Sequence, residues 1–363
     1  MNRHHRAMQL IAEARTAVLD DAPDRPVPHF PDASAPARPA RRASRRLVLA
    51  GLVPTVAVAV TAGVAVVVAS SSHPPAESPP VARPAGPAQP VTAQGILLAA
   101  AEKTAASAPA TGGYWVKKDE LDNIYDVGGY RVLGRVEVET WYSLRAGGDV
   151  VFVIRSLGAA PATDADKAAW RAAGSPTKWH LTGPEGKQSR GRNLSAEPGP
   201  RKVSVMPDGS FSIGGTQLTY AQLRALPTDP GKLKAHLIKL DDAAAGGHRS
   251  TWTPEQIERW RVEMLFSQSW ELLSQLPVSP AVRAATYRML AGLSGLTVAE
   301  NVRDAKGRTG VGISHTSHNA DGSSVETQLI IDPDSGALLA QKQRSGTSLL
   351  LDARFSDATP PRS

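Results

Sequence analysis

The chain has 363 residues and an apolar fraction of 41%, which is sufficient for a folded core. It contains no cysteine, so disulfides, thiol nucleophiles and cysteine-ligated zinc sites are excluded. The formal net charge is +7, but five arginines cluster within residues 38–46, without interleaved aromatic residues or a nucleic-acid-binding motif. The sequence therefore does not indicate a nucleic-acid partner.

The first 69 residues read as a cytoplasmic tail followed by a membrane anchor. Residues 1–46 are rich in Pro, Ala and Arg and are expected to be mostly disordered, while residues 47–69 carry no charge over 23 positions. About 20 apolar residues suffice to span a bilayer as a helix. Basic residues flank membrane helices on the cytoplasmic side, and four lie directly before this one: Arg41, Arg42, Arg45 and Arg46. We expect a single-pass protein of the cell membrane, with the lipid bilayer as a partner and the C-terminal domain extracytoplasmic.

A second interpretation of the same segment is export with cleavage. The stretch "SRRLVL", Ser44 to Leu49, resembles a twin-arginine export signal. The 46 residues that precede the apolar run are too long for an ordinary secretory signal. Both interpretations place the downstream domain outside the cytoplasm. Residues 70–92 follow as a Pro/Ala-rich stalk, with seven prolines between positions 71 and 90.

Residues 93–345 read as one folded domain that begins with a helix and continues with strands. Gly95 to Ala108 has a helical pattern, and Tyr114 to Lys117 follows as a short strand. Between Tyr130 and Ser143 apolar and charged residues alternate, which is typical of a half-buried strand, and Val150 to Arg155 is a second apolar run. Residues 183–202, rich in Gly, Pro, Ser and Arg, are expected to form a surface loop.

The centre of the domain reads as helical. Thr219 with Gln222, and Thr253 with Gln256, both match a capping box, which indicates two helix starts. The helix after Thr253 carries Trp260 and Trp270. These two tryptophans are candidates for lining a hydrophobic-ligand pocket, with ordinary core packing as the alternative.

Strand patterns return near the C-terminus and complete the fold class. Gly310 to His315, Val325 to Ile331 and Ala337 to Gln343 are separated by the turn sequences "NADG" and "DPDSG", which predicts a three-stranded meander. Residues 346–363 are expected to be a flexible tail. Strands, helices and strands in this order predict an α+β domain in which an antiparallel sheet wraps against helices.

Four sequence blocks in the folded domain resemble those of a known family. "LPTDPGKL", "AVRAATYRMLAGLSGL", "DAKGRTGVGI" and "LIIDPDSGALL", behind an arginine-flanked span and a Pro-rich stalk, look like a family of uncharacterised actinobacterial single-pass membrane proteins. The resemblance implies the architecture and topology above, and a sigma-factor-associated role for some members. It carries no catalytic residue. The order of elements is also loosely similar to the half-barrel of lipoprotein carriers.

No group of residues predicts an enzymatic site. His315 and His318 are three residues apart on a strand, which places them on opposite faces. Glu137 and Glu139 share a face with arginines and indicate a charge-paired exterior. Asp241 and Asp242 resemble a solvated helix end, and the spacing around Ser294 differs from a nucleophile elbow. We therefore expect neither a cofactor nor a metal, and no catalytic residue.

Three functions remain, in this order. The first is a non-catalytic anchored binding or regulatory module, which signals to a cytoplasmic regulatory protein. The second is a carrier or sensor of a lipid or another hydrophobic ligand. The third is an exported hydrolase, for which the sequence offers no set of catalytic residues.

Overall fold

The computed structural model describes residues 92–182, 188–245, 249–318 and 323–362. The predicted cytoplasmic tail, membrane span and nearly all of the stalk lie outside these ranges, as do Arg41, Arg42, Arg45 and Arg46. None of the helices in the described ranges is both long and apolar enough to cross a membrane.

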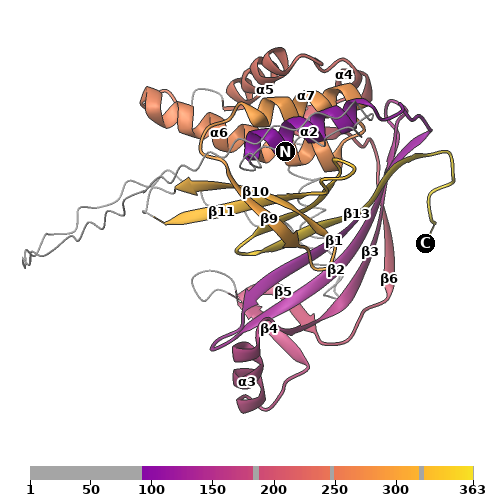
Figure 1. Ribbon diagram of the computed structural model, residues 1–363. Helices are drawn as coiled ribbons and strands as arrows, with labels where there is room; N and C mark the ends of the chain where they lie inside the picture. The colour runs from indigo at the N-terminus through magenta and orange to yellow at the C-terminus, as the bar shows by residue number, and fades with distance from the viewer. Residues whose placement is uncertain (1–91, 183–187, 246–248, 319–322, 363) are drawn as a thin grey trace, which may run out of the picture. The chain divides into compact units, whose positions relative to one another are not determined.

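A nine-stranded antiparallel sheet dominates the described residues (Figure 1). Its strands follow one another in space as β6-β3-β2-β1-β13-β12-β11-β10-β9. The strands are β1 (Tyr114–Asp126), β2 (Arg131–Ser143), β3 (Val150–Pro161), β6 (Arg201–Met206), β9 (Thr297–Arg303), β10 (Thr309–His318), β11 (Ser324–Ile331), β12 (Leu338–Gln343) and β13 (Gly346–Ser356). Two short hairpins stand outside this sheet: β4 (Lys178–Thr182) with β5 (Gln188–Ser195), and β7 (Phe211–Ile213) with β8 (Thr216–Leu218).

Helices pack against one side of this sheet (Figure 1). They are α2 (Ala93–Ala105), α4 (Tyr220–Arg224), α5 (Pro230–Ala245), α6 (Pro254–Trp270), the π-helix η2 (Glu271–Gln275) and α7 (Pro280–Ala291). A further helix, α3 (Asp164–Ala172), lies apart from them and packs with the β4–β5 hairpin (Figure 1). Both predicted capping boxes are present, at Thr219 before α4 and at Thr253 before α6. The side-chain oxygen of each threonine satisfies a backbone N–H that has no partner inside its helix.

Two apolar cores hold the helices in place. In the first, α2 and α7 pack on β10 and β11 through residues such as Leu97, Tyr287 and Ile313. In the second, α4, α5, α6 and α7 pack around the β7–β8 hairpin through residues such as Leu223 and Leu265. The C-terminal strands are therefore the part of the sheet that the helices cover most fully.

The strand register separates the two sides of the N-terminal half of the sheet. Trp115 and Lys117 of β1 contact Gln275 of η2, so their side is called the helix-facing side here. Because side chains alternate along a strand, Val116 and Lys118 lie on the opposite side. Residues paired across neighbouring strands lie on the same side of the sheet, so the pairing also assigns the residues of β2, β3 and β6 to one side or the other.

The prediction of a flexible tail from residue 346 is wrong for most of that segment. Residues Gly346–Ser356 form β13, which lies between β1 and β12 in the middle of the sheet. Register shifts between β13 and β1 so that Leu350 and Asp352 pair with successive residues of β1, which leaves Leu351 as a bulge. The bulge interrupts the alternation of apolar and polar residues that marks a strand in a sequence.

Other elements differ in extent from the predictions. The expected loop at residues 183–202 contains β5 and the first residues of β6. The predicted strand at Tyr114 to Lys117 extends to Asp126 as β1, and Val150 to Arg155 extends to Pro161 as β3. The three-stranded C-terminal meander is confirmed as β10–β11–β12. At the level of fold class, the domain is α+β with a large antiparallel sheet and helices.

Candidate binding surfaces

An apolar cluster covers the helix-facing side of β1, β2 and β3. Its six members are at most 8% exposed, and pairing across the strands places them on one side of the sheet: Leu121, Val136, Val138, Val150, Phe152 and Ile154. Tyr142 and Met206 pack against them, and these also come from the sheet. Among the described residues, no apolar helix side chain joins this cluster, in contrast to the cores under α2, α6 and α7.

A buried polar group borders the apolar cluster where β1 approaches η2. The ammonium group of Lys117 contacts the carboxylate of Asp119 and the side-chain oxygen of Gln275. Lys117 and Asp119 are 7% and 3% exposed, and the second carboxylate oxygen of Asp119 has no hydrogen-bond partner. Burial raises the pKa of the neighbouring Tyr142, with Lys117 lowering this pKa and Asp119 raising it. A charge pair at the border of an apolar surface is suited to hold the polar end of an amphipathic molecule.

A second group of polar side chains lies where η2 meets the β7–β8 hairpin. The backbone N–H of Gly214 donates a 2.9 Å hydrogen bond to the carboxylate of Glu271. Burial raises the pKa of Glu271 to about 7, against the lowering effect of that hydrogen bond. Gln268, one turn earlier, is 2% exposed, and neither atom of its amide has a hydrogen-bond partner. Gly214 has φ of 53°, and a Cβ built on it would stand 2.1 Å from the Gln268 amide nitrogen, so the side chain packs directly on the glycine.

The structure gives Trp260 a different environment from the predicted ligand pocket. Its indole N–H donates a 3.1 Å hydrogen bond to Asp241, and the guanidinium of Arg249 lies 4.9 Å from the centre of its ring. Arg249 also bonds Asp241, at 2.5 Å, and Trp252 packs edge-on against Trp260. This group joins the end of α5 to α6. Asp241 is 7% exposed, so the prediction of a solvated helix end is wrong for it.

Trp270 lies apart from Trp260. Trp270 packs against the core formed by α2, α7, β10 and β11, whereas Trp260 packs against the core around the β7–β8 hairpin. Neither tryptophan belongs to the apolar cluster of β1–β3. The arrangement favours the core-packing alternative for both residues.

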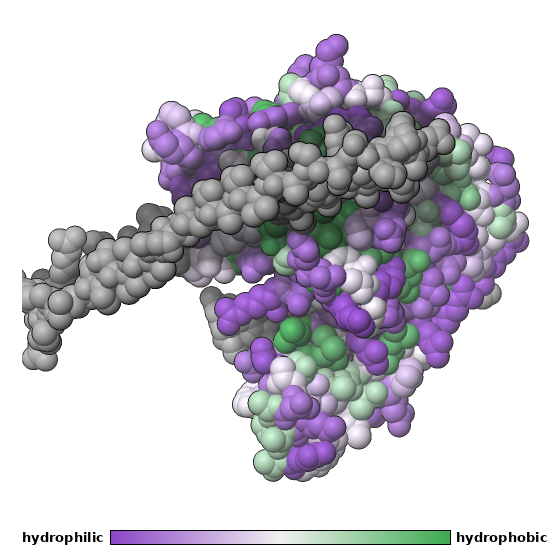
Figure 2. Space-filling view, viewed as in Figure 1, coloured by the Kyte–Doolittle hydropathy of each residue, from purple (hydrophilic) through white to green (hydrophobic). Residues whose placement is uncertain are grey.

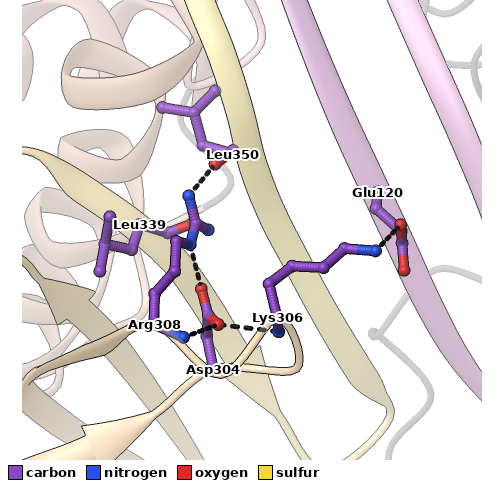
Figure 3. Close-up of polar contacts among 6 residues, drawn as sticks. All are labelled: Glu120, Asp304, Lys306, Arg308, Leu339 and Leu350. Atoms are coloured by element: carbon purple, nitrogen blue, oxygen red, sulfur yellow. Dashed lines mark hydrogen bonds and ion pairs between the residues drawn. The ribbon is translucent and has the colours of Figure 1, made fainter.

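The turn between β9 and β10 forms a polar clamp on the sheet (Figure 3). Arg308 donates to Asp304 at 2.6 Å, and also to the carbonyl oxygens of Leu350 in β13 and Leu339 in β12 at 2.9 and 3.0 Å. Regular pairing of β12 with β13 ends at Ala340 and Leu349. The Arg308 guanidinium thus bridges the two strands where their own hydrogen bonds stop. Lys306, from the same turn, reaches Glu120 of β1 at 2.5 Å.

The histidine pair and the glutamate pair considered from the sequence have structural contacts: His315 packs in the core, and the two glutamates bind neighbouring side chains. His315 is 8% exposed and packs on Phe266, and burial lowers its pKa, while His318 is exposed. Glu137 pairs with Lys118 at 3.0 Å, and Glu139 accepts a 2.6 Å hydrogen bond from the indole of Trp141. Within the described ranges, no group of three His, Asp or Glu side chains is arranged to hold a metal ion.

The surface of the described domain is mixed in character. Figure 2 shows hydrophilic side chains over much of the outline of the molecule, and apolar side chains gathered nearer the middle of the view.

The sequence alone does not identify Lys117 and Asp119 as candidate site residues. Two charged residues in a strand usually indicate solvent exposure, and here they are buried because η2, more than 150 residues later in the chain, covers them.

Searches against protein-family models, curated proteins and solved structures found no match for this chain.

Proposed function

We propose that the chain is a membrane-anchored extracytoplasmic binding module, and that its ligand is a hydrophobic or amphipathic molecule. The observation that carries the proposal is the apolar cluster of β1–β3. The helix-facing side of the C-terminal strands is filled by helices, but on β1–β3 all apolar residues described in the cluster come from strands. The six side chains are at most 8% exposed, so a ligand's hydrocarbon chain would enter an apolar interior, where each buried CH₂ contributes about 0.8 kcal/mol.

Lys117, Asp119 and Tyr142 support an amphipathic ligand. They lie on the same side of the sheet as the apolar cluster, because Lys117 and Leu121 are four residues apart on β1 and Trp115 pairs with Tyr142. Asp119 pairs directly with Val138 of the cluster. The second carboxylate oxygen of Asp119 is buried without a hydrogen-bond partner, so a ligand hydroxyl or amide that enters beside it would satisfy it.

A charge placed inside the cluster tests this proposal. In binding titrations with a fluorescent fatty acid, Val138→Glu should weaken binding by at least about tenfold, because an unpaired carboxylate on an apolar surface is costly. Val205→Glu is the matched control, since Val205 is 57% exposed on β6, and it should bind like the parent protein. Equal affinities for the parent and Val138→Glu, with both folded by circular dichroism, would contradict the proposal.

The anchor and the inward signal remain the sequence-based part of the proposal. They are supported by the uncharged run at residues 47–69 and by the arginines before it. The resemblance to a sigma-factor-associated family suggests a cytoplasmic regulatory protein as the partner of residues 1–46. Deletion of residues 1–36 should then alter the transcript profile of the cell, and an unchanged profile would limit the function to the outer module.

A further inference from the structure

A small hollow lies on the side of the sheet opposite the helices. It encloses about 210 Å³, and its lining combines both signs of charge with a short loop: Glu137, Glu139, Val153, Arg155, Gly199, Pro200 and Arg201. Pairing across β2, β3 and β6 places Glu137, Arg155 and Arg201 side by side in one row. The base of the hollow is therefore the face of β2, β3 and β6 that points away from the helices.

The two arginines in this row form no ion pair with a residue that the structure describes. Arg155 and Arg201 are directly opposite each other on antiparallel strands, which brings their Cβ atoms to about 5 Å. Like charges in this arrangement are destabilising. Both side chains are exposed, and neither guanidinium has an ion pair or hydrogen bond to another residue that the structure describes. Two adjacent guanidiniums with free donors are the arrangement that holds a phosphate or carboxylate.

The glutamates in the hollow do not neutralise these arginines. Glu137 is opposite Arg155 across β2 and β3, yet it pairs with Lys118 on its other side. One carboxylate oxygen of Glu139 accepts the Trp141 indole N–H. The second carboxylate oxygen of Glu139 is not used by this bond, and Glu139 lies diagonal to Arg155, about 7–8 Å away at the backbone.

A glycine lets the loop that carries Gly199 and Pro200 pack closely against β3. Gly158 has φ of 88°, and a Cβ built on it would stand 2.4 Å from the carbonyl oxygen of Ala196. Only glycine allows the loop before β6 to approach β3 this closely. The same loop is tied down by a 3.0 Å hydrogen bond from the N–H of Gly199 to the carbonyl of Ser156. The hollow is thus preorganised, which lowers the entropic cost of binding.

We propose that this hollow binds a small zwitterion that carries a phosphate or carboxylate at one end and a primary ammonium at the other. Arg155 and Arg201 hold the anionic group, and Glu139 holds the ammonium. The volume suits a ligand of headgroup size and is below the range of pockets for drug-sized molecules. The site is independent of the apolar cluster, which lies on the other side of the sheet.

Calorimetric titration of the full chain, in a non-ionic detergent, with O-phosphoethanolamine as the probe tests the site. The parent protein should bind the probe at least about tenfold more tightly than inorganic phosphate or ethanolamine alone. Arg155→Gln and Arg201→Gln should each weaken binding by about tenfold or more, because each removes a charge-assisted hydrogen bond. Glu139→Gln should abolish the preference for the probe over phosphate. Arg303→Gln, an exposed strand arginine on β9, is the control and should bind normally.

Three results would overturn the proposal: no binding of the probe at millimolar concentration, equal affinity for inorganic phosphate, or unchanged affinity in both arginine variants. Titration with detergent-solubilised phosphatidylethanolamine separates the two sources of the zwitterion. Binding of this lipid as well as the free probe supports a lipid headgroup, and binding of the free probe alone supports a soluble zwitterion. Both outcomes retain the site.

Discussion

At the residue scale, the Arg308 side chain donates hydrogen bonds to three residues from the turn before β10 and from two strands of the sheet. It bridges β12 and β13 through two carbonyls and neutralises Asp304, whose side chain is fully buried. Arg308→Met should lower the free energy of unfolding by about 2–3 kcal/mol, because it removes the side-chain donor to one oxygen of a buried carboxylate and to two carbonyls. Urea denaturation measures this change. Arg303→Met, at an exposed position, should change the same quantity by less than about 0.5 kcal/mol, and a similar loss in both variants would contradict the role of the bridge.

Also at the residue scale, Glu271 should make stability depend on pH. Its pKa in the folded protein is about 7, above the value of about 4.3 in an unfolded chain, so the folded state binds more protons between these two values. Stability should therefore fall as pH rises from about 4.5 to 7, and roughly 1–2 kcal/mol of this fall should vanish in Glu271→Gln, a figure reduced for solvent screening because the residue as a whole is partly exposed. Denaturant titrations at pH 5 and pH 8 measure the difference. Glu258→Gln, at an exposed glutamate, should retain the parent's pH dependence, and retention by Glu271→Gln as well would refute the assignment.

At the element scale, β13 joins the two halves of the sheet. It pairs with β1 over ten residues and with β12 over four. A chain that ends at residue 345 loses this strand and should not fold cooperatively, because β1 and β12 would each expose an unpaired edge. A chain that ends at Asp357 keeps the strand and the 2.8 Å hydrogen bond to Gly113, and it should unfold like the full chain. Thermal unfolding followed by circular dichroism distinguishes the two, and cooperative unfolding of the shorter chain would show that β13 is dispensable.

The same elements show what the sequence can and cannot predict. Helix α6 starts where Thr253, Pro254 and Gln256 predict, because a capping box is a local signal. The sequence does not predict strand β13, because the bulge at Leu351 breaks its alternation of apolar and polar residues. The site residues Lys117 and Asp119 depend on Gln275, which is far away in the sequence, so no local pattern identifies them. The sequence predicts that Glu137 and Glu139 lie on a charged exterior, but the hollow that they line also needs the loop at Gly199, which no local pattern places there.

At the scale of the whole molecule, the sequence and the structure address different parts of the chain. The arginines and the uncharged run of residues 47–69 predict where the protein resides, and the described residues provide the surfaces on which a ligand can bind. If the anchor prediction holds, protease added to intact protoplasts should digest residues 94–363 and spare a tag at Met1. Protection of both ends would contradict this topology.

The most direct test of the binding module is native mass spectrometry of the full chain, purified from its membrane in a non-ionic detergent. The account predicts a reproducible added mass that disappears after extraction with organic solvent and is absent from Val138→Glu but present in Val205→Glu. A mass equal to that of the bare polypeptide in the parent protein, under conditions that preserve a known lipid complex, would contradict a hydrophobic ligand on β1–β3.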